Sequence, residues 1–188
     1  MLKKFKTWYQ NIFKQQERLK RRELLDVKNH QVEIRDTLYF LAKAQFTDIP
    51  EILGIERAVY GGKTPWDSTA FAAEINRIND RLYLVLRRND RLLAVVGCSF
   101  DHSKKEAHVT NIAVVPDYQN RGLGYFLMTT VIKKTRELEY LRVTLEVRIS
   151  NEHAQRIYRD LGFQNDGIKR GYYFGDHEDA QDMTLILN

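Results

Sequence analysis

The stretch NIAVVPDYQNRGLGYFLM, residues 111–128, decides the fold of this chain. Its apolar first part predicts a strand over residues 107–115, which ends at Pro116 because proline cannot donate to a strand ladder. Gly122 and Gly124 then open a helical pattern. The first N–H groups of a helix lack helical partners, so an anion such as pyrophosphate is stabilised at this point.

Two glycines at a helix start also fit a plain strand-to-helix turn, and the residues alone leave both interpretations open. A side chain at either position would keep a ligand from the backbone, and Arg121 could add a charge-assisted contact to an anion. The stretch lacks the GKS or GKT of a P-loop and the three glycines of a Rossmann turn. A ligand bound here is therefore expected to be a different phosphate compound.

Outward from this turn, short apolar runs alternate with helical patterns, which predicts one α/β or α+β domain over residues 31–188. Asp48 is expected to cap a helix that starts at Ile49, and Gly162 to end the last helix as a left-handed cap. The predicted strands cover residues 37–42, 81–87, 92–100, 107–115, 142–147, 163–169 and 182–187. The other predicted helices cover residues 68–76, 122–139 and 151–161.

The first 30 residues differ from the rest in charge. They hold nine Lys/Arg and three Asp/Glu, a net charge of +6, whereas residues 31–188 hold 21 and 22, a net charge of −1. Apolar residues recur at helical spacing, which predicts a basic amphipathic helical extension over residues 1–30. Residues 1–28 could pack on the domain or a partner protein, contact the ribosome, or dock on a membrane surface. No RNA-recognition motif is present, so direct sequence-specific nucleic-acid binding is not expected.

The composition excludes several other classes of protein. No apolar run approaches the roughly 20 residues that cross a bilayer, and polar residues interrupt any signal-peptide stretch, so a cytoplasmic protein is expected. Cys98 is the single cysteine and lies in an apolar run, which predicts a buried core residue and no disulfide. The five histidines lack the spacing of a zinc site, so no metal is expected.

Four segments, in order, resemble the GNAT acetyltransferase superfamily. QNRGLG at 119–124 is similar to its Q/R-x-x-G-x-G/A acetyl-CoA signature, and three later segments are similar to the RimI group of ribosomal-protein alanine N-acetyltransferases: LEVRISN at 145–151, IYRDLGF at 157–163 and KRGYYF at 169–174. The resemblance covers about residues 36–188. It implies acetyl-CoA as co-substrate and a mixed, mostly antiparallel central sheet with flanking helices, whose strands at 107–115 and 142–147 splay apart.

The resemblance also implies a cofactor site. Backbone groups of residues 112–114 would line the pantetheine arm and polarise the thioester carbonyl, which is an oxyanion-type role. Asn151 would contact acetyl-CoA, cap its own helix, or do both. The expected cofactor-binding residues are Ile112, Ala113, Val114, Gln119, Asn120, Arg121, Gly122, Leu123, Gly124, Tyr125 and Asn151.

Amide formation from an amine and a thioester calls for a base and an acid near the cofactor sulfur. Glu146 shares one strand face with Thr144, and partial desolvation there is expected to raise its pKa, which makes it the candidate base, directly or through a water. The resemblance implies that Tyr158 protonates the leaving thiolate, although its helical spacing also fits a core aromatic. A phenol with a pKa near 10 carries its proton at neutral pH.

The aromatic run and the acidic loop that follows it are candidates for substrate contact. The resemblance places Tyr172 and Tyr173 beside a peptide-binding groove, although ordinary strand aromatics fit as well. The loop carboxylates either attract a basic protein tail or form a plain solvated loop. They are Asp176, Glu178, Asp179 and Asp182.

These expectations predict an enzyme that transfers acetyl from acetyl-CoA to the N-terminal α-amine of a protein. In its most specific form the substrate is the N-terminal alanine of a small-subunit ribosomal protein. An acetyltransferase for a small amine or a lysine is the alternative within the same class, because kinship of fold does not fix the substrate. A non-catalytic CoA-binding or ribosome-tethering module is the alternative from another class, and it predicts that Glu146→Gln and Tyr158→Phe are tolerated.

Overall fold

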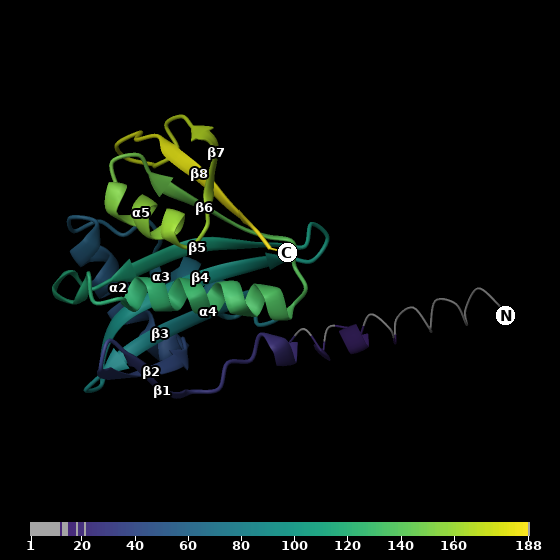
Figure 1. The fold of residues 1–188 in the computed structure, drawn as a ribbon. Helices are drawn as coiled ribbons and strands as arrows, with labels where there is room; N and C mark the ends of the chain where they lie inside the picture. The colour runs from purple at the N-terminus through teal and green to yellow at the C-terminus, as the bar shows by residue number, and fades with distance from the viewer. Residues whose placement is uncertain (1–11, 13–14, 18, 21, 188) are drawn as a thin grey trace.

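The structure is a computed structural model, and it describes residues 12, 15–17, 19–20 and 22–187 (Figure 1). The strands are β1 (His30–Ile34), β2 (Thr37–Lys43), β3 (Arg81–Arg88), β4 (Arg91–Asp101), β5 (Glu106–Val114), β6 (Arg142–Arg148), β7 (Gln164–Lys169) and β8 (Ala180–Ile186). The helices are α2 (Ile49–Val59), α3 (Ser68–Ile75), α4 (Leu123–Glu137) and α5 (Glu152–Asp160), with short 3-10 turns η1 (Phe46–Asp48) and η2 (Pro116–Tyr118).

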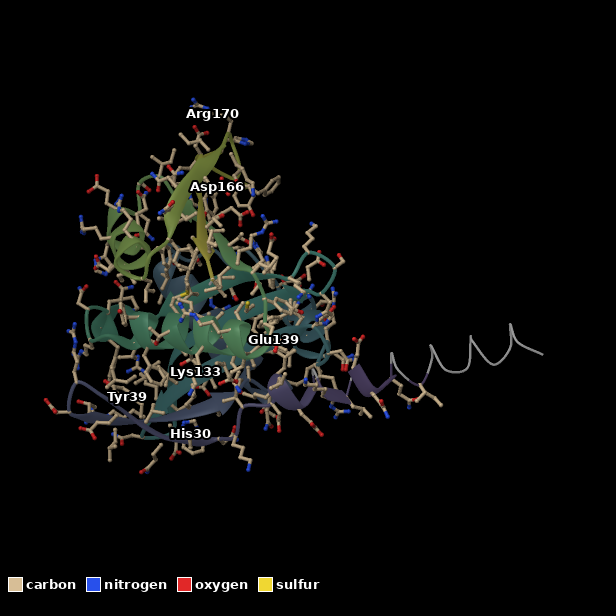
Figure 2. All side chains as sticks on the ribbon, turned by 45° about the vertical axis from the view of Figure 1, so that its right-hand side comes forward. His30, Tyr39, Lys133, Glu139, Asp166 and Arg170 are labelled. Carbon is tan, nitrogen blue, oxygen red and sulfur yellow. The ribbon has the colours of Figure 1, made fainter. Side chains whose placement is uncertain are left out.

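Within the described residues the strands form one eight-stranded sheet in the order β1-β2-β3-β4-β5-β6-β8-β7. Neighbouring strands are antiparallel except for β5 and β6, which are parallel. Figure 2 shows the two edges, with His30 on β1 and Asp166 on β7 on opposite sides of the molecule. The predicted mixed, mostly antiparallel sheet is confirmed.

The parallel strands β5 and β6 pair only over their first halves. The register runs from Glu106 opposite Arg142 to Val109 opposite Leu145, and the strands then diverge. Beyond that point β5 stays bonded to β4 as far as Val114, while β6 stays bonded to β8 along its whole length. The predicted splay is therefore confirmed, and a wedge opens at the middle of the sheet.

Helices cover both faces of the sheet. The side chain of Asn111 on β5 meets Glu56 of α2, whereas its neighbour Ile112 points the other way, toward Gly124 of α4. Strand residues alternate between faces, so α2 and α4 lie on opposite sides of β5. The α5 helix lies beside β6, β8 and β7 (Figure 1), and at its end a Cβ at Gly162 would lie 3.2 Å from Leu185 Cδ1 of β8.

Two local expectations hold in the core. Cys98 on β4 is fully buried, and burial raises the pKa of its thiol, so it is a core residue as predicted. Gly162 ends α5 with a φ of 93°, the left-handed conformation that favours glycine, and this prediction is also confirmed.

The prediction that the sheet begins at residue 37 is wrong, because β1 precedes β2 in a hairpin. Its two turn residues, Arg35 and Asp36, have φ values of 49° and 59°, as in a type I′ turn. Only two apolar residues alternate along β1, Val32 and Ile34, and only Ile34 is buried, so the pattern is too short to indicate a strand by itself.

The prediction that Asp48 caps α2 is also wrong. The η1 turn carries Asp48 into helical dihedrals before α2 begins, and its side chain accepts no cap bond from the helix. Instead, Oδ2 accepts from the backbone N–H of Gln45 at 2.8 Å and Oδ1 accepts from Arg87 Nη2 at 2.6 Å. Asp48 therefore joins the start of α2 to β3.

The predicted basic helix over residues 1–30 lies largely outside the described residues. The described positions between 12 and 24 are helical, and Leu25 and Val27 are buried in the core. Nowhere in the described part of the chain is there a helix long and apolar enough to cross a membrane.

Candidate functional site

The wedge between β5 and β6 is occupied by two neighbouring cavities. One, of about 770 Å³, is lined by the glycine turn at the start of α4 and is called the turn cavity. The other, of about 410 Å³, is lined by Glu56 and Glu146 and is called the carboxylate cavity. The two share Ile112, Asn151 and Tyr158 among their lining residues, so they meet at the point of the splay.

Left-handed backbone conformations shape the turn. Gly122 is the N-cap of α4 with a φ of 87°, and Asn120 also has a positive φ, of 60°. Gln119 donates from Nε2 to the carbonyl of Val114 at 3.2 Å, which ties the turn to the end of β5. Because the first amides of α4 have no helical partner, the turn presents N–H donors and the positive end of a helix dipole to the cavity.

Ten of the eleven residues predicted to bind cofactor line the turn cavity, and Arg121 does not. The Arg121 guanidinium instead stacks over the Tyr118 ring, 4.8 Å from its centroid. Arg35, from the β1–β2 turn, does line the cavity and donates from Nη1 to the carbonyl of Asn120 at 2.7 Å. Arg35 was not among the predicted site residues, because the β1–β2 hairpin that carries it was not predicted.

Glu146 stands in a chain of polar contacts in the carboxylate cavity. Its Oε2 lies 3.2 Å from His108 Nε2, and its Oε1 pairs with Lys169 Nζ. The Nδ1 atom of His108 is 3.0 Å from Thr144 Oγ1. His108 was not predicted as a site residue; it comes from β5, and only the pairing of β5 with β6 brings it next to Glu146.

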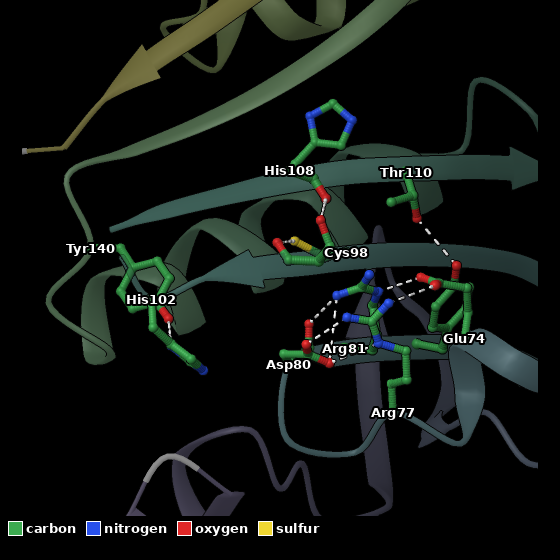
Figure 3. A network of polar contacts seen from close by, with 11 residues as sticks. Glu74, Arg77, Asp80, Arg81, Cys98, His102, His108, Thr110 and Tyr140 are labelled. Carbon is green, nitrogen blue, oxygen red and sulfur yellow. Dashed lines mark hydrogen bonds and ion pairs between the residues drawn. The ribbon is translucent and has the colours of Figure 1, made fainter. Parts of the chain in front are cut away.

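The expected rise in the pKa of Glu146 is wrong. Burial alone would raise this pKa, but the hydrogen bonds and charges of His108 and Lys169 outweigh burial and lower it to about 2. Figure 3 shows the His108 ring on the side of β5 that faces away from the ion-pair cluster of Arg77, Asp80 and Arg81. The pKa of Glu146 is set by burial, His108 and Lys169, and not by that cluster. Glu146 is therefore ionised at neutral pH.

Tyr158 and Asn151 occupy the junction of the two cavities. Tyr158 is 6% exposed, and burial raises the pKa of its phenol above the usual range, so the hydroxyl keeps its proton. Asn151 Oδ1 accepts from the backbone N–H of Ala154 at 3.1 Å, which makes it the cap of α5 while it also lines both cavities. Capping is thus observed, and the position is compatible with a cofactor contact.

Tyr172 and Tyr173 both line the carboxylate cavity, and Tyr172 is 47% exposed. Their position fits the predicted substrate contact. Arg148 lies over the Tyr173 ring, 4.0 Å from its centroid. Asp176, Glu178 and Asp179 lie in the loop, whereas Asp182 lies on β8. The four carboxylates form ion pairs with Arg148, Lys169 and Arg170, and these ion pairs hold the segment in place.

Residues 37–163 match the family described as "Acetyltransferase (GNAT) family". The chain belongs to this family. A 36% identical relative from Salmonella typhimurium, aligned over 76% of this chain and 93% of its own, is named [ribosomal protein bS18]-alanine N-acetyltransferase. The crystal structure of the ribosomal-protein-S18-alanine N-acetyltransferase from Escherichia coli superposes with a TM-score of 0.70 at 32% identity, over 80% of this chain and 94% of that one.

A third similarity concerns a GNAT fold with its ligand. A structure described as "yncA, a putative ACETYLTRANSFERASE from Salmonella typhimurium with its cofactor Acetyl-CoA" superposes with a TM-score of 0.66 over 79% of this chain and 93% of that one. At 21% identity it shows the shared fold alone. Members of the GNAT family use acetyl-CoA. The turn cavity fits this molecule, because the free amides at the start of α4 and the Arg35 guanidinium suit its phosphates and the volume of about 770 Å³ suits its size.

A matched pair of glycine variants tests the turn. Gly122→Ala places a side chain at φ 87° and 3.2 Å from Ile34 Cγ2, whereas a Cβ at Gly124 meets Val114 Cγ2 at an ordinary 3.7 Å. The left-handed strain of about 1–2 kcal/mol is expected to move the turn of Gly122→Ala out of its binding conformation and to weaken CoA binding about tenfold. The acetyl-CoA signature quoted above accepts alanine at the position of Gly124, so Gly124→Ala is expected to stay within about threefold. Calorimetric titration with CoA measures both, and equal affinities would contradict the assigned turn.

Proposed function

We propose that this chain transfers the acetyl group of acetyl-CoA to the N-terminal α-amine of a protein, most specifically the N-terminal alanine of a small-subunit ribosomal protein. The observation that carries the proposal is the meeting of the two cavities at Ile112, Asn151 and Tyr158. A thioester in the turn cavity and an amine in the carboxylate cavity would come together at the splay, where the transfer takes place.

The first amides of α4 and the Arg35 guanidinium would hold the pyrophosphate of acetyl-CoA. The pantetheine arm would then run along residues 112–114, whose backbone has no partner on β6 because the strands have separated. Acetyl-CoA supplies the activated acyl group. An N–H of this part of β5 would stabilise the charge that develops on the thioester oxygen.

Glu146 would act on the amine rather than on the thioester. When an amine attacks a carbonyl, its nitrogen becomes positively charged before it loses a proton. An ionised carboxylate with a pKa of about 2 is a weak base, but it stabilises that positive charge and accepts the acidic proton, directly or through a water. His108 and Lys169 would keep Glu146 ionised and oriented.

The α-amine is the acceptor that this site suits best. With a pKa near 8 it is far easier to deprotonate than a lysine near 10.4, so a site with a weak base is matched to it. The relatives from Salmonella typhimurium and Escherichia coli are named as alanine N-acetyltransferases of ribosomal protein S18. Their names support an N-terminal alanine of a ribosomal protein as the substrate.

Incubation with acetyl-CoA and synthetic peptides that differ only in their first residue tests the proposal. We expect thiol release with an alanine peptide, and mass spectrometry should place the acetyl group on the α-amine. A blocked peptide carrying one internal lysine serves as the control for lysine acetylation. Thiol release with that peptide alone would favour a lysine acetyltransferase, and CoA binding without thiol release from any peptide would favour a binding module.

A further inference from the structure

A second carboxylate, Glu56 of α2, lies in the carboxylate cavity and has no role in the steps above. Its residue is only 2% exposed, and its Oε1 accepts from Asn111 Nδ2 at 3.4 Å. The other oxygen, Oε2, is buried and accepts no hydrogen bond of good geometry among the described residues. A buried carboxylate oxygen without a partner costs stability, so its presence calls for a ligand or a function.

The surroundings of Glu56 hold it in this position. Asn111, which donates to it, has its own amide packed against Gly97, where a Cβ would lie 2.3 Å from Asn111 Oδ1 and 2.4 Å from Tyr83 Cε1. The β4–β5 register shifts at Gly97, which lets the Asn111 side chain approach this closely. Asn111 is therefore held by packing, and it positions Glu56 through the 3.4 Å contact to Oε1.

The two carboxylates of the cavity differ in what their oxygens can accept. Both oxygens of Glu146 are engaged, one by His108 and one by Lys169. Glu56 makes no ion pair among the described residues: burial raises its pKa, and only the contacts from Asn111 and the backbone of Trp66 offset part of this rise. The other titratable or charged groups that line the cavity are Tyr60, His108, Arg148, Tyr158, Tyr172 and Tyr173.

We propose that Glu56 receives the acceptor's amine, with Oε2 accepting one of its N–H bonds. The inference rests on the proposed function and names the residue that recognises the amine. A primary amine brings hydrogen-bond donors, and Oε2 is the buried carboxylate oxygen of this cavity that makes no hydrogen bond of good geometry among the described residues. Asn111 Oδ1 in the same cavity is also without a partner in the described part of the chain, but a neutral amide oxygen attracts an amine less strongly than a carboxylate does. Glu56 would fix the position of the nitrogen, and Glu146 would then stabilise the charge that develops during attack.

Glu56→Gln is the direct test, because glutamine keeps the shape and removes the charge. If the amide oxygen of the new glutamine continues to accept from Asn111, the NH₂ group of the glutamine points at the acceptor's amine. Two hydrogen-bond donors then face each other, and the amine is repelled. The neutral variant is expected to unfold at the same or a higher temperature. Since the pKa of Glu56 is raised in the folded state, the wild-type carboxylate lowers stability as the pH rises through that pKa, and glutamine lacks this effect.

The readout is peptide binding to the protein saturated with CoA, which cannot react. Two probes are compared by calorimetry, an alanine-first peptide and the same peptide with a propionyl group in place of its alanine, which lacks only the amine. The wild-type protein is expected to bind the alanine-first peptide at least about tenfold more tightly than the propionyl peptide. The affinities of Glu56→Gln for the two peptides are expected to agree within about twofold. Glu56→Asp, which withdraws the carboxylate by one methylene, should give an intermediate preference.

Glu137→Gln on α4 is the matched control, because Glu137 pairs with Lys134 and lies outside both cavities. It should keep the full preference for the free amine. The same preference in Glu56→Gln, or none in wild type, would overturn the inference. Failure of the proposed function would be seen separately, as no thiol release by the wild-type protein with any peptide.

Discussion

Glu146→Gln is expected to lower kcat by about 100-fold or more and to leave CoA affinity within about twofold. Glutamine keeps the shape of the side chain but can neither stabilise the cationic nitrogen of the attacking amine nor accept its proton. It also loses the ion pairs to His108 and Lys169, neither of which lines the turn cavity. Steady-state rates at saturating peptide, together with calorimetry using CoA, separate the two effects.

Stability provides a check on this variant. Glu146 has a pKa of about 2 in the folded protein against an ordinary 4.5, so its contribution to stability is present above pH 4.5 and is lost as the pH falls toward 2. Glu146→Gln should therefore unfold more easily than wild type at pH 7, by at most about 3 kcal/mol, and the difference should shrink between pH 5 and pH 2. Rates are to be compared at a temperature where both proteins are folded.

The same Glu137→Gln control should retain wild-type kcat, which excludes a general effect of removing a carboxylate. Wild-type turnover in Glu146→Gln would contradict the assigned role and would favour the CoA-binding module. A loss of CoA affinity equal to the loss of turnover would instead indicate that the variant disturbs the splay.

Features that lie within one stretch of chain could be predicted from sequence. The strand, proline and two glycines of residues 111–124 follow one another along the chain, so the position of the turn and the part of the cavity lining that it supplies follow directly from the pattern. The direction of side chains along β6 also follows from alternation, which places Glu146 beside Thr144 on one face.

Features that depend on contacts across the sheet could not be predicted. His108 meets Glu146 only because β5 and β6 pair in parallel with one particular register. The same contact, together with that of Lys169 from β7, reverses the expected shift in the pKa of Glu146. Arg35 was missed for a related reason, since it sits in the turn of a hairpin whose first strand is mostly exposed.

Tyr158→Phe is expected to lower kcat by about 100-fold while the protein keeps its fold and its affinity for CoA. A departing CoA thiolate has the basicity of an ordinary thiol, near pKa 8.5, and a nearby phenol that holds its proton can supply one to it. The buried hydroxyl of Tyr158 meets this requirement, because burial raises its pKa and its ring lies where the two cavities join.

The substitution removes one oxygen and leaves the ring, whose packing against Phe163 should keep α5 in place. Tyr39→Phe on β2 (Figure 2) is the matched control, since Tyr39 is 3% exposed and lines neither cavity. Because the pKa of Tyr158 is raised, its deprotonation should not limit wild-type kcat up to at least pH 9. A falling rate between pH 7 and pH 9, or equal kcat values for Tyr158→Phe and Tyr39→Phe, would show that the thiolate takes its proton from another source.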